Sequence, residues 1–158
     1  TGRVEGWVPH VGAGGILCIE PSTRRSAKGF GEMRTTLIEK GLGIWGPCLH
    51  SQACPLLEGR DWCHFSSPGR IESRWFEALS KQLGSVREWF KYTYLWVGPG
   101  AQPVAGASSR RIVSDPIPSK TGGGRADLLV CEPEQVQRIP VTMQSPFRRG
   151  MLWSVNKK

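Results

Sequence analysis

Residues 15–46 read GILCIEPSTRRSAKGFGEMRTTLIEKGLGIWG, and this stretch decides the fold class. The apolar run at 16–19 follows a Gly-Gly turn and stops at a Glu-Pro pair, which predicts a short buried strand. Apolar residues then recur with a helical period across 29–41, and GIWG at 43–46 predicts a second strand. The order strand, helix, strand is typical of an α/β domain, so we predict that fold class.

The helix expected at 29–41 has one apolar face. Residues three, four and seven positions apart share a helix face, so this spacing predicts that the helix packs on a sheet. Gly41 is expected to end the helix, because glycine readily adopts the left-handed conformation of a C-terminal cap. The apolar stripe consists of Phe30, Met33, Leu37 and Ile38.

The second predicted strand leads directly into a loop rich in metal-binding residue types. Residues 46–66 read GPCLHSQACPLLEGRDWCHFS and contain Cys48, Cys54 and Cys63 in a C-x5-C-x8-C spacing. An odd number of cysteines and no visible secretory signal argue against a disulfide framework. Three clustered thiols exceed what one catalytic nucleophile needs. A metal centre explains the clustering, because thiolates bind zinc and iron–sulfur clusters.

A closed structural metal site needs a fourth ligand, and three residues are candidates. His50 and His64 lie in the same loop, and Cys131 ends an apolar strand-like run much later in the chain. Sequence spacing does not choose among them. The remaining cysteine, Cys18, lies within the first apolar strand and is expected to be a small buried apolar residue.

Further elements follow the loop. The pattern predicts an amphipathic helix at 70–84 and a strand at 89–97, and the alternating aromatic residues of that strand are expected to face the core. These residues are Phe90, Tyr92, Tyr94 and Trp96. The helix stripe is expected to be Ile71, Trp75, Leu79 (or Ala78) and Leu83.

The second half of the chain is predicted to be rich in strands. Short apolar segments at 110–115, 125–131 and 136–142 have the composition of strands. Gly, Pro, Ala and Ser dominate 98–109, which is typical of a linker. We therefore predict three parts: 1–97 as an α/β domain carrying the loop 46–66, 98–109 as a linker, and 110–158 as a β-rich extension with a basic tail.

Composition narrows the class of partner. The 158 residues carry a formal net charge of +8, which favours a polyanionic partner because neutralising phosphates releases condensed counterions. An apolar fraction of 39% excludes a disordered chain. No apolar run approaches the roughly 18 residues of a membrane-spanning helix, so no span is expected.

Two segments of the loop match a known signature. PCLHSQACPL at 47–56 followed by DWCHFS at 61–66 resembles the motif of the ribosomal small-subunit methyltransferase-like family of mitochondria and bacteria. The flanking segments GGILCIEPST, FKYTYLWV and RRIVSDPIPSKTGGGRADLLVCEPE resemble that family in the same order. The resemblance implies a class I methyltransferase (Rossmann-like) fold with an inserted cysteine cluster.

The same resemblance implies a ligand set. Cys48, Cys54, Cys63 and Cys131 correspond to four ligands of an iron–sulfur centre, a 4Fe–4S cluster, with zinc as the alternative metal. His50 and His64 correspond to motif residues near the centre.

The resemblance also implies a function. Family members bind the mitochondrial small ribosomal subunit and assist its assembly, so the expected partners are small-subunit rRNA and ribosomal proteins in the mitochondrion. The Gly-rich loop that holds S-adenosylmethionine in such folds is absent from this sequence. We therefore expect the C-terminal half of the fold, with its N-terminal half cut off, lost or supplied by a second chain, and no catalysis. The alternative is the C-terminal part of an S-adenosylmethionine-dependent rRNA methyltransferase.

Clusters of basic residues are the expected rRNA contacts, because Lys and Arg side chains bind phosphates without reading the base sequence. The candidates are Arg24, Arg25, Lys28, Arg110, Arg111, Arg148, Arg149, Lys157 and Lys158.

Overall fold

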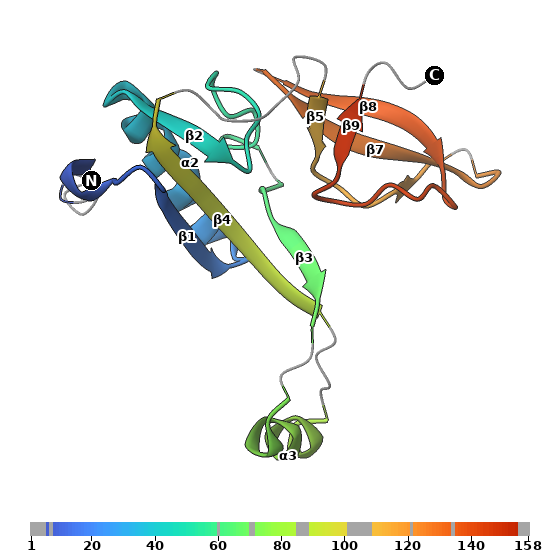
Figure 1. The fold of residues 1–158 in the computed structure, drawn as a ribbon. Coiled ribbons are helices and arrows are strands. Elements are labelled where there is room, and N and C mark those ends of the chain that lie inside the picture. Colours follow the sequence, from blue (N-terminus) through green and yellow to red (C-terminus); the bar gives the residue numbers. More distant parts are fainter. Residues whose placement is uncertain are drawn as a thin grey trace.

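The computed structural model describes residues 6, 8–59, 61–69, 72–84, 89–100, 109–120, 122–133 and 135–154. Within these residues the chain forms two antiparallel sheets and two α-helices (Figure 1). The elements are η1 (Val8–His10), β1 (Ile16–Pro21), α2 (Arg24–Glu39), β2 (Leu42–Gly46), β3 (Phe65–Pro68), α3 (Arg74–Gln82), β4 (Trp89–Pro99), β5 (Ser109–Ile112), β6 (Ile117–Pro118), β7 (Arg125–Glu132), β8 (Gln135–Thr142) and β9 (Leu152–Ser154).

The first sheet is built around the long strand β4 (Figure 1). Strand β1 pairs with one edge of β4, while β2 and β3 lie one after the other along the opposite edge. All three pairings are antiparallel, so β1 and β2 run in the same direction with β4 between them. The mixed α/β class is as predicted, but these strands do not form the parallel sheet of a complete Rossmann-like fold.

The cysteine loop leaves and re-enters this sheet along one edge of β4. It begins where β2 ends at Gly46 and returns where β3 begins at Phe65. The Thr93 hydroxyl on β4 donates to the Cys63 carbonyl at 3.0 Å. The loop therefore projects from the middle of the sheet edge with both of its ends anchored on the same strand.

Helix α2 packs on one face of the first sheet, as its predicted stripe requires. Leu37 joins Ile44, Leu95 and Val97 in a buried core, with the other predicted stripe residues packed around them. The Thr23 side chain accepts a hydrogen bond from the Ser26 backbone N–H and caps the helix, which therefore starts earlier than the predicted 29. Gly41, with φ of +80°, follows the helix end as expected.

The prediction for the aromatic face of β4 was wrong. The side that meets α2 carries Thr93, Leu95 and Val97, which are all buried. The aromatic side faces away from the helix, and its Trp96 is 40% exposed. Alternation shows that a strand has two faces, but not which of them a helix will cover.

Strand β1 also differs from its predicted burial. Cys18 is half-buried, while Leu17 and Ile19 on the other face are 55% and 61% exposed. Those two side chains lie on the same uncovered face as Trp96 and Tyr94, their register partners on β4. The first sheet is thus covered by a helix on one face, and much of its opposite face is open at β1.

The second sheet contains all the strands predicted in the C-terminal half. Strand β7 pairs with β8 along one edge and with β5 and β6 along the other, and β9 extends the sheet beside β5. Ile112, Leu128 and Val130 form its buried core. The predicted domain boundaries stay a prediction, since most of the expected linker lies outside the described residues.

Helix α3 lies beyond the end of the β3–β4 ribbon, away from both sheets (Figure 1). Its predicted stripe is present but exposed, with Trp75 at 68% and Leu83 at 70%. Ile71, the first residue of that predicted stripe, lies outside the described residues. Neither described helix combines the length and hydrophobicity that crossing a membrane requires.

Candidate metal centre

The predicted ligands come from both sheets. Cys48 follows β2, Cys54 and Cys63 lie farther along the same loop, and Cys131 belongs to β7 of the second sheet. None of these four described cysteines forms a disulfide. A small cavity of about 20 Å³ is bordered by Cys48, Cys63 and Cys131 together. The fold thus brings the distant Cys131 to the loop, which spacing alone could not predict.

The pKa values of the thiols indicate a buried and mutually interacting group. Burial raises the pKa of Cys63 well above its usual range, and the nearby thiols of Cys48, Cys131 and Cys54 raise it further. Burial, followed by Cys48 and Cys54, raises the pKa of Cys131 to about 12. Without a metal these thiols stay protonated, so a bound cation must displace their protons.

A buried arginine organises the loop from helix α2. Arg34 is 2% exposed, and its Nη2 donates to the carbonyls of His50 at 2.6 Å and Gln52 at 2.7 Å. Burial raises the pKa of Cys48, and Arg34, which hydrogen-bonds to that thiol, opposes the rise. Arg34 was not among the residues predicted for the site, because in the sequence it is one cation within an amphipathic helix.

Arg111 and Arg149 also face the thiols, although the sequence suggested an rRNA role for both. Arg111 donates from Nε to the Pro47 carbonyl at 3.1 Å and from Nη1 to the Gly150 carbonyl at 2.6 Å. In the described part of the chain, Nε and Nη1 of Arg149 are buried without a hydrogen-bond partner. Arg149 also lowers the pKa of Cys63. Cations therefore surround the four thiols, which suits a centre with four negatively charged ligands.

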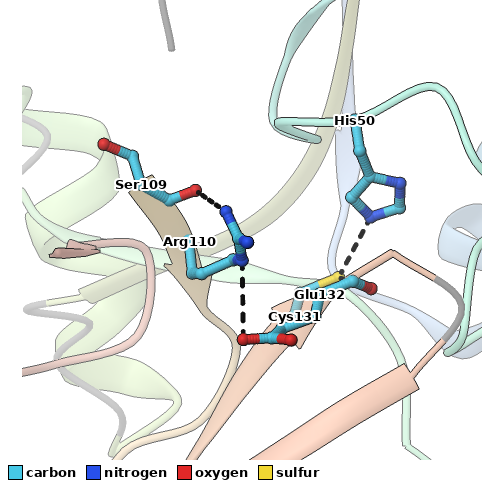
Figure 2. Close-up of polar contacts among 5 residues, drawn as sticks. All are labelled: His50, Ser109, Arg110, Cys131 and Glu132. Atoms are coloured by element: carbon cyan, nitrogen blue, oxygen red, sulfur yellow. Dashed lines mark hydrogen bonds and ion pairs between the residues drawn. The ribbon is translucent and has the colours of Figure 1, made fainter. Parts of the chain in front are cut away.

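The two loop histidines have different surroundings. Figure 2 shows the His50 ring directed at the Cys131 sulfur, with 3.7 Å between Nε2 and Sγ. His64 instead contacts the Trp62 carbonyl through Nδ1 at 3.0 Å. Burial lowers the pKa of both, so the imidazoles are neutral near pH 7. Of the two histidines, only His50 contacts a predicted ligand among the described contacts.

The donor set fits a thiolate-bound metal group, but not a preformed site for one ion. Among the described residues, no three His, Cys, Asp or Glu side chains are arranged to hold a single metal ion. The four thiols nevertheless interact with one another and are bracketed by arginines. Four grouped thiols are a donor set of the type that zinc and iron–sulfur clusters both use.

A larger hollow adjoins this site. It has a volume of about 530 Å³ and shares Cys54 and Cys63 with the thiol group. Three predicted rRNA contacts from the start of α2 line it, namely Arg24, Arg25 and Lys28, together with Trp62 and the acidic residues Glu58 and Asp61. Trp62 is fixed by a hydrogen bond from its Nε1 to the Ser22 carbonyl at 3.0 Å.

Two other predicted rRNA contacts, Arg110 and Arg148, bind groups of the protein itself. Arg110 pairs with Glu132 at 3.5 Å, as Figure 2 shows, and Arg148 donates to the carbonyls of Ser145 and Phe147. Lys157 and Lys158 lie outside the described residues.

Comparison with known proteins covers almost the whole chain. A family model described as mitochondrial small ribosomal subunit Rsm22 matches residues 9–158, including the whole cysteine loop and Cys131. No curated protein matches the chain.

Proposed function

Because the chain belongs to the Rsm22 family of the mitochondrial small ribosomal subunit, we propose that it is a non-catalytic component or assembly factor of that subunit. In this proposal it binds small-subunit rRNA, and its four cysteines hold a structural iron–sulfur cluster. The family is mitochondrial, so the predicted localisation is confirmed. The observation that carries the structural role is the meeting of Cys131 with the loop cysteines.

The cluster serves as a staple between the two sheets. No strand of the first sheet pairs with a strand of the second among the described strands. The contacts between the two parts include the Arg111 bond to Pro47 and the approach of His50 to Cys131. A centre bound by three loop cysteines and Cys131 adds coordinate bonds across the same junction. Its binding free energy then becomes folding free energy.

An iron–sulfur cluster is the proposed centre and zinc is the alternative, because four thiolates are a ligand set that both use. A cluster distributes its four thiolate bonds over several iron atoms, so its ligands need not converge on one point. When bound, such a cluster supplies strong iron–thiolate bonds, and Cys48, Cys54, Cys63 and Cys131 supply the thiolates.

The basic hollow is the proposed rRNA contact. Arg24, Arg25 and Lys28 lie in the first turns of α2, where the helix dipole already favours anions. The first turn of α2 contains no acidic side chain, and Glu58 and Asp61 from the loop offset only part of the positive charge of the hollow. The hollow also contains Trp62, an aromatic ring of the kind that stacks on unpaired bases. Phosphate binding beside an aromatic ring favours single-stranded rRNA segments.

Reversing two charges in the hollow tests this contact. The double variant Arg25→Glu, Lys28→Glu should bind a small-subunit rRNA fragment about tenfold or more weakly at low salt, because two phosphate contacts become repulsive. The slope of log affinity against log salt should also fall by about one for each lost contact. Fluorescence anisotropy with labelled RNA over a salt series measures both quantities.

The matched control reverses two exposed lysines elsewhere, Lys81→Glu on α3 and Lys120→Glu between β6 and β7. It changes the net charge equally but leaves the hollow intact. Equal losses of affinity in the two double variants would show that the RNA responds to net charge alone, and the hollow would lose its role.

The runner-up function is a partial methyltransferase whose cofactor half lies elsewhere. The exposed face and outer edge of β1 favour this function, because the missing N-terminal half of the fold could pack there. Strand β1 has no second partner strand among the described residues and exposes Leu17 and Ile19. Binding of S-adenosylmethionine by the native assembly, measured with radiolabelled cofactor, separates this function from the structural one.

A further inference from the structure

One polar contact reaches a predicted ligand across the junction of the two sheets. His50 comes from the cysteine loop and Cys131 from β7, and Figure 2 shows the imidazole Nε2 directed at Sγ at 3.7 Å. That separation lies within hydrogen-bonding range for a sulfur acceptor. The contact therefore links His50, which is not a predicted ligand, to Cys131, the one predicted ligand on the second sheet.

Arg34 holds the backbone of His50 in place. The guanidinium donates to the His50 carbonyl at 2.6 Å and to the Gln52 carbonyl at 2.7 Å, so the backbone on both sides of Ser51 is tied to helix α2. Arg34 is itself buried, at 2% exposure, which restricts its freedom to move. The loop backbone that carries the imidazole is therefore anchored to helix α2 through Arg34.

The chemistry of a bound centre determines which atom donates. A cysteine that binds a metal does so as a thiolate and has no proton to give. A hydrogen bond between the two groups must then run from Nε2–H of His50 to the sulfur of Cys131.

We propose that His50 is a positioning residue of the metal centre, donating Nε2–H to the Cys131 thiolate while Arg34 holds its backbone in place. This inference rests on the metal centre of the proposed function. Such a bond orients the ligand and withdraws charge from its sulfur. On an iron–sulfur cluster, hydrogen bonds to sulfur raise the reduction potential, because they stabilise the more negative reduced state.

The competing role for His50 is that of a ligand. The described geometry favours the donor role, because the imidazole Nε2 is directed at the Cys131 sulfur at hydrogen-bonding distance. A nitrogen ligand bonds directly to iron and couples strongly to its electron spin, whereas a donor to sulfur couples weakly and through an exchangeable proton. Spectroscopy therefore separates the two roles.

The experiment compares three variants of the full chain with wild type after anaerobic cluster assembly. His50→Ala removes the donor, His50→Gln retains an N–H donor on a side chain of similar length, and His64→Ala removes the other loop histidine, which contacts the Trp62 carbonyl. The measurements are metal content, rate of metal release to a chelator, and reduction potential followed by electron paramagnetic resonance.

We expect His50→Ala to lower metal affinity by about 10- to 100-fold, the usual effect of losing a hydrogen bond to a metal ligand, and to shift the reduction potential downward. His50→Gln should recover much of both properties, and His64→Ala should resemble wild type. Pulsed resonance of wild type should show a weakly coupled exchangeable deuteron that His50→Ala lacks.

Two results would overturn the inference while leaving the metal centre standing. One is a His50→Ala protein whose potential and release rate equal those of wild type, and the other is a strongly coupled histidine nitrogen. If wild type binds zinc, the release rates still decide the role of His50, although the iron–sulfur assignment fails. A wild-type chain that takes up no metal overturns this inference together with the proposed centre.

Discussion

Cys131→Ser should remove the metal centre and lower the free energy of unfolding by several kcal/mol. Structural zinc in zinc-finger peptides binds with an apparent free energy of about 10–16 kcal/mol, and binding of a structural metal centre is coupled to folding in the same way. Serine keeps the size of the side chain but does not provide a thiolate. Because Cys131 is the single predicted ligand on the second sheet, its loss should also free the loop at 47–64 from that sheet.

Denaturant unfolding and metal analysis of the anaerobically purified full chain measure these effects. Cys54→Ser should behave in the same way, since it removes another of the four thiolates. The matched control is Cys18→Ser, which changes a half-buried thiol in β1 outside the site and should retain the metal. A Cys131→Ser protein that melts cooperatively at the wild-type midpoint would rule out the staple.

The second large effect is expected at Arg34, which no pattern in the sequence marked. Arg34→Leu removes the donor of two part-buried hydrogen bonds to the carbonyls of His50 and Gln52. Gln52 is exposed, so water can replace the lost donor there, and we expect a loss of about 1–3 kcal/mol, mainly from the His50 carbonyl. The loop should also bind its metal more weakly, because the segment between Cys48 and Cys54 loses its anchor.

Urea unfolding of the variant, compared with Arg25→Leu, tests this expectation. Arg25 lies on the same helix but is exposed, so its replacement should change the stability by no more than about 0.5 kcal/mol. Arg34→Lys should fall between the two, since one ammonium cannot reproduce the fork of a guanidinium. Equal stabilities for Arg34→Leu and Arg25→Leu would mean that the two Arg34 hydrogen bonds do not organise the loop.

Local signals in the sequence were sufficient for β1, α2, β2 and β4 of the first layer, whereas β3 (Phe65–Pro68) was not predicted. The periodic stripe from Phe30 to Ile38 located α2, and the Gly41 cap located its end, because both depend on neighbours within a few residues. Pairing between distant strands depends on contacts that no local pattern encodes. The position of β4 between β1 and β2 was therefore not predicted, and neither was the face of β4 that α2 covers.

The candidate site divides in the same way. Clustered thiols at Cys48, Cys54 and Cys63 indicated a metal loop from composition and spacing alone, whereas Cys131 was one of three candidates for the fourth ligand and only the family resemblance selected it. Arg111 had the same appearance in the sequence as any surface cation, yet its guanidinium binds carbonyls beside the thiols. Whether a cation faces water or a buried group is decided by tertiary packing, which a single sequence does not display.

The most direct test of the central claim is iron-edge X-ray absorption of the full chain, purified or assembled without oxygen. We predict a first shell made of sulfur alone and a second shell from neighbouring iron atoms, with both signals lost in Cys131→Ser. A chain that contains zinc in place of iron, or iron whose first shell is unchanged by that substitution, would contradict a cluster held across the two sheets.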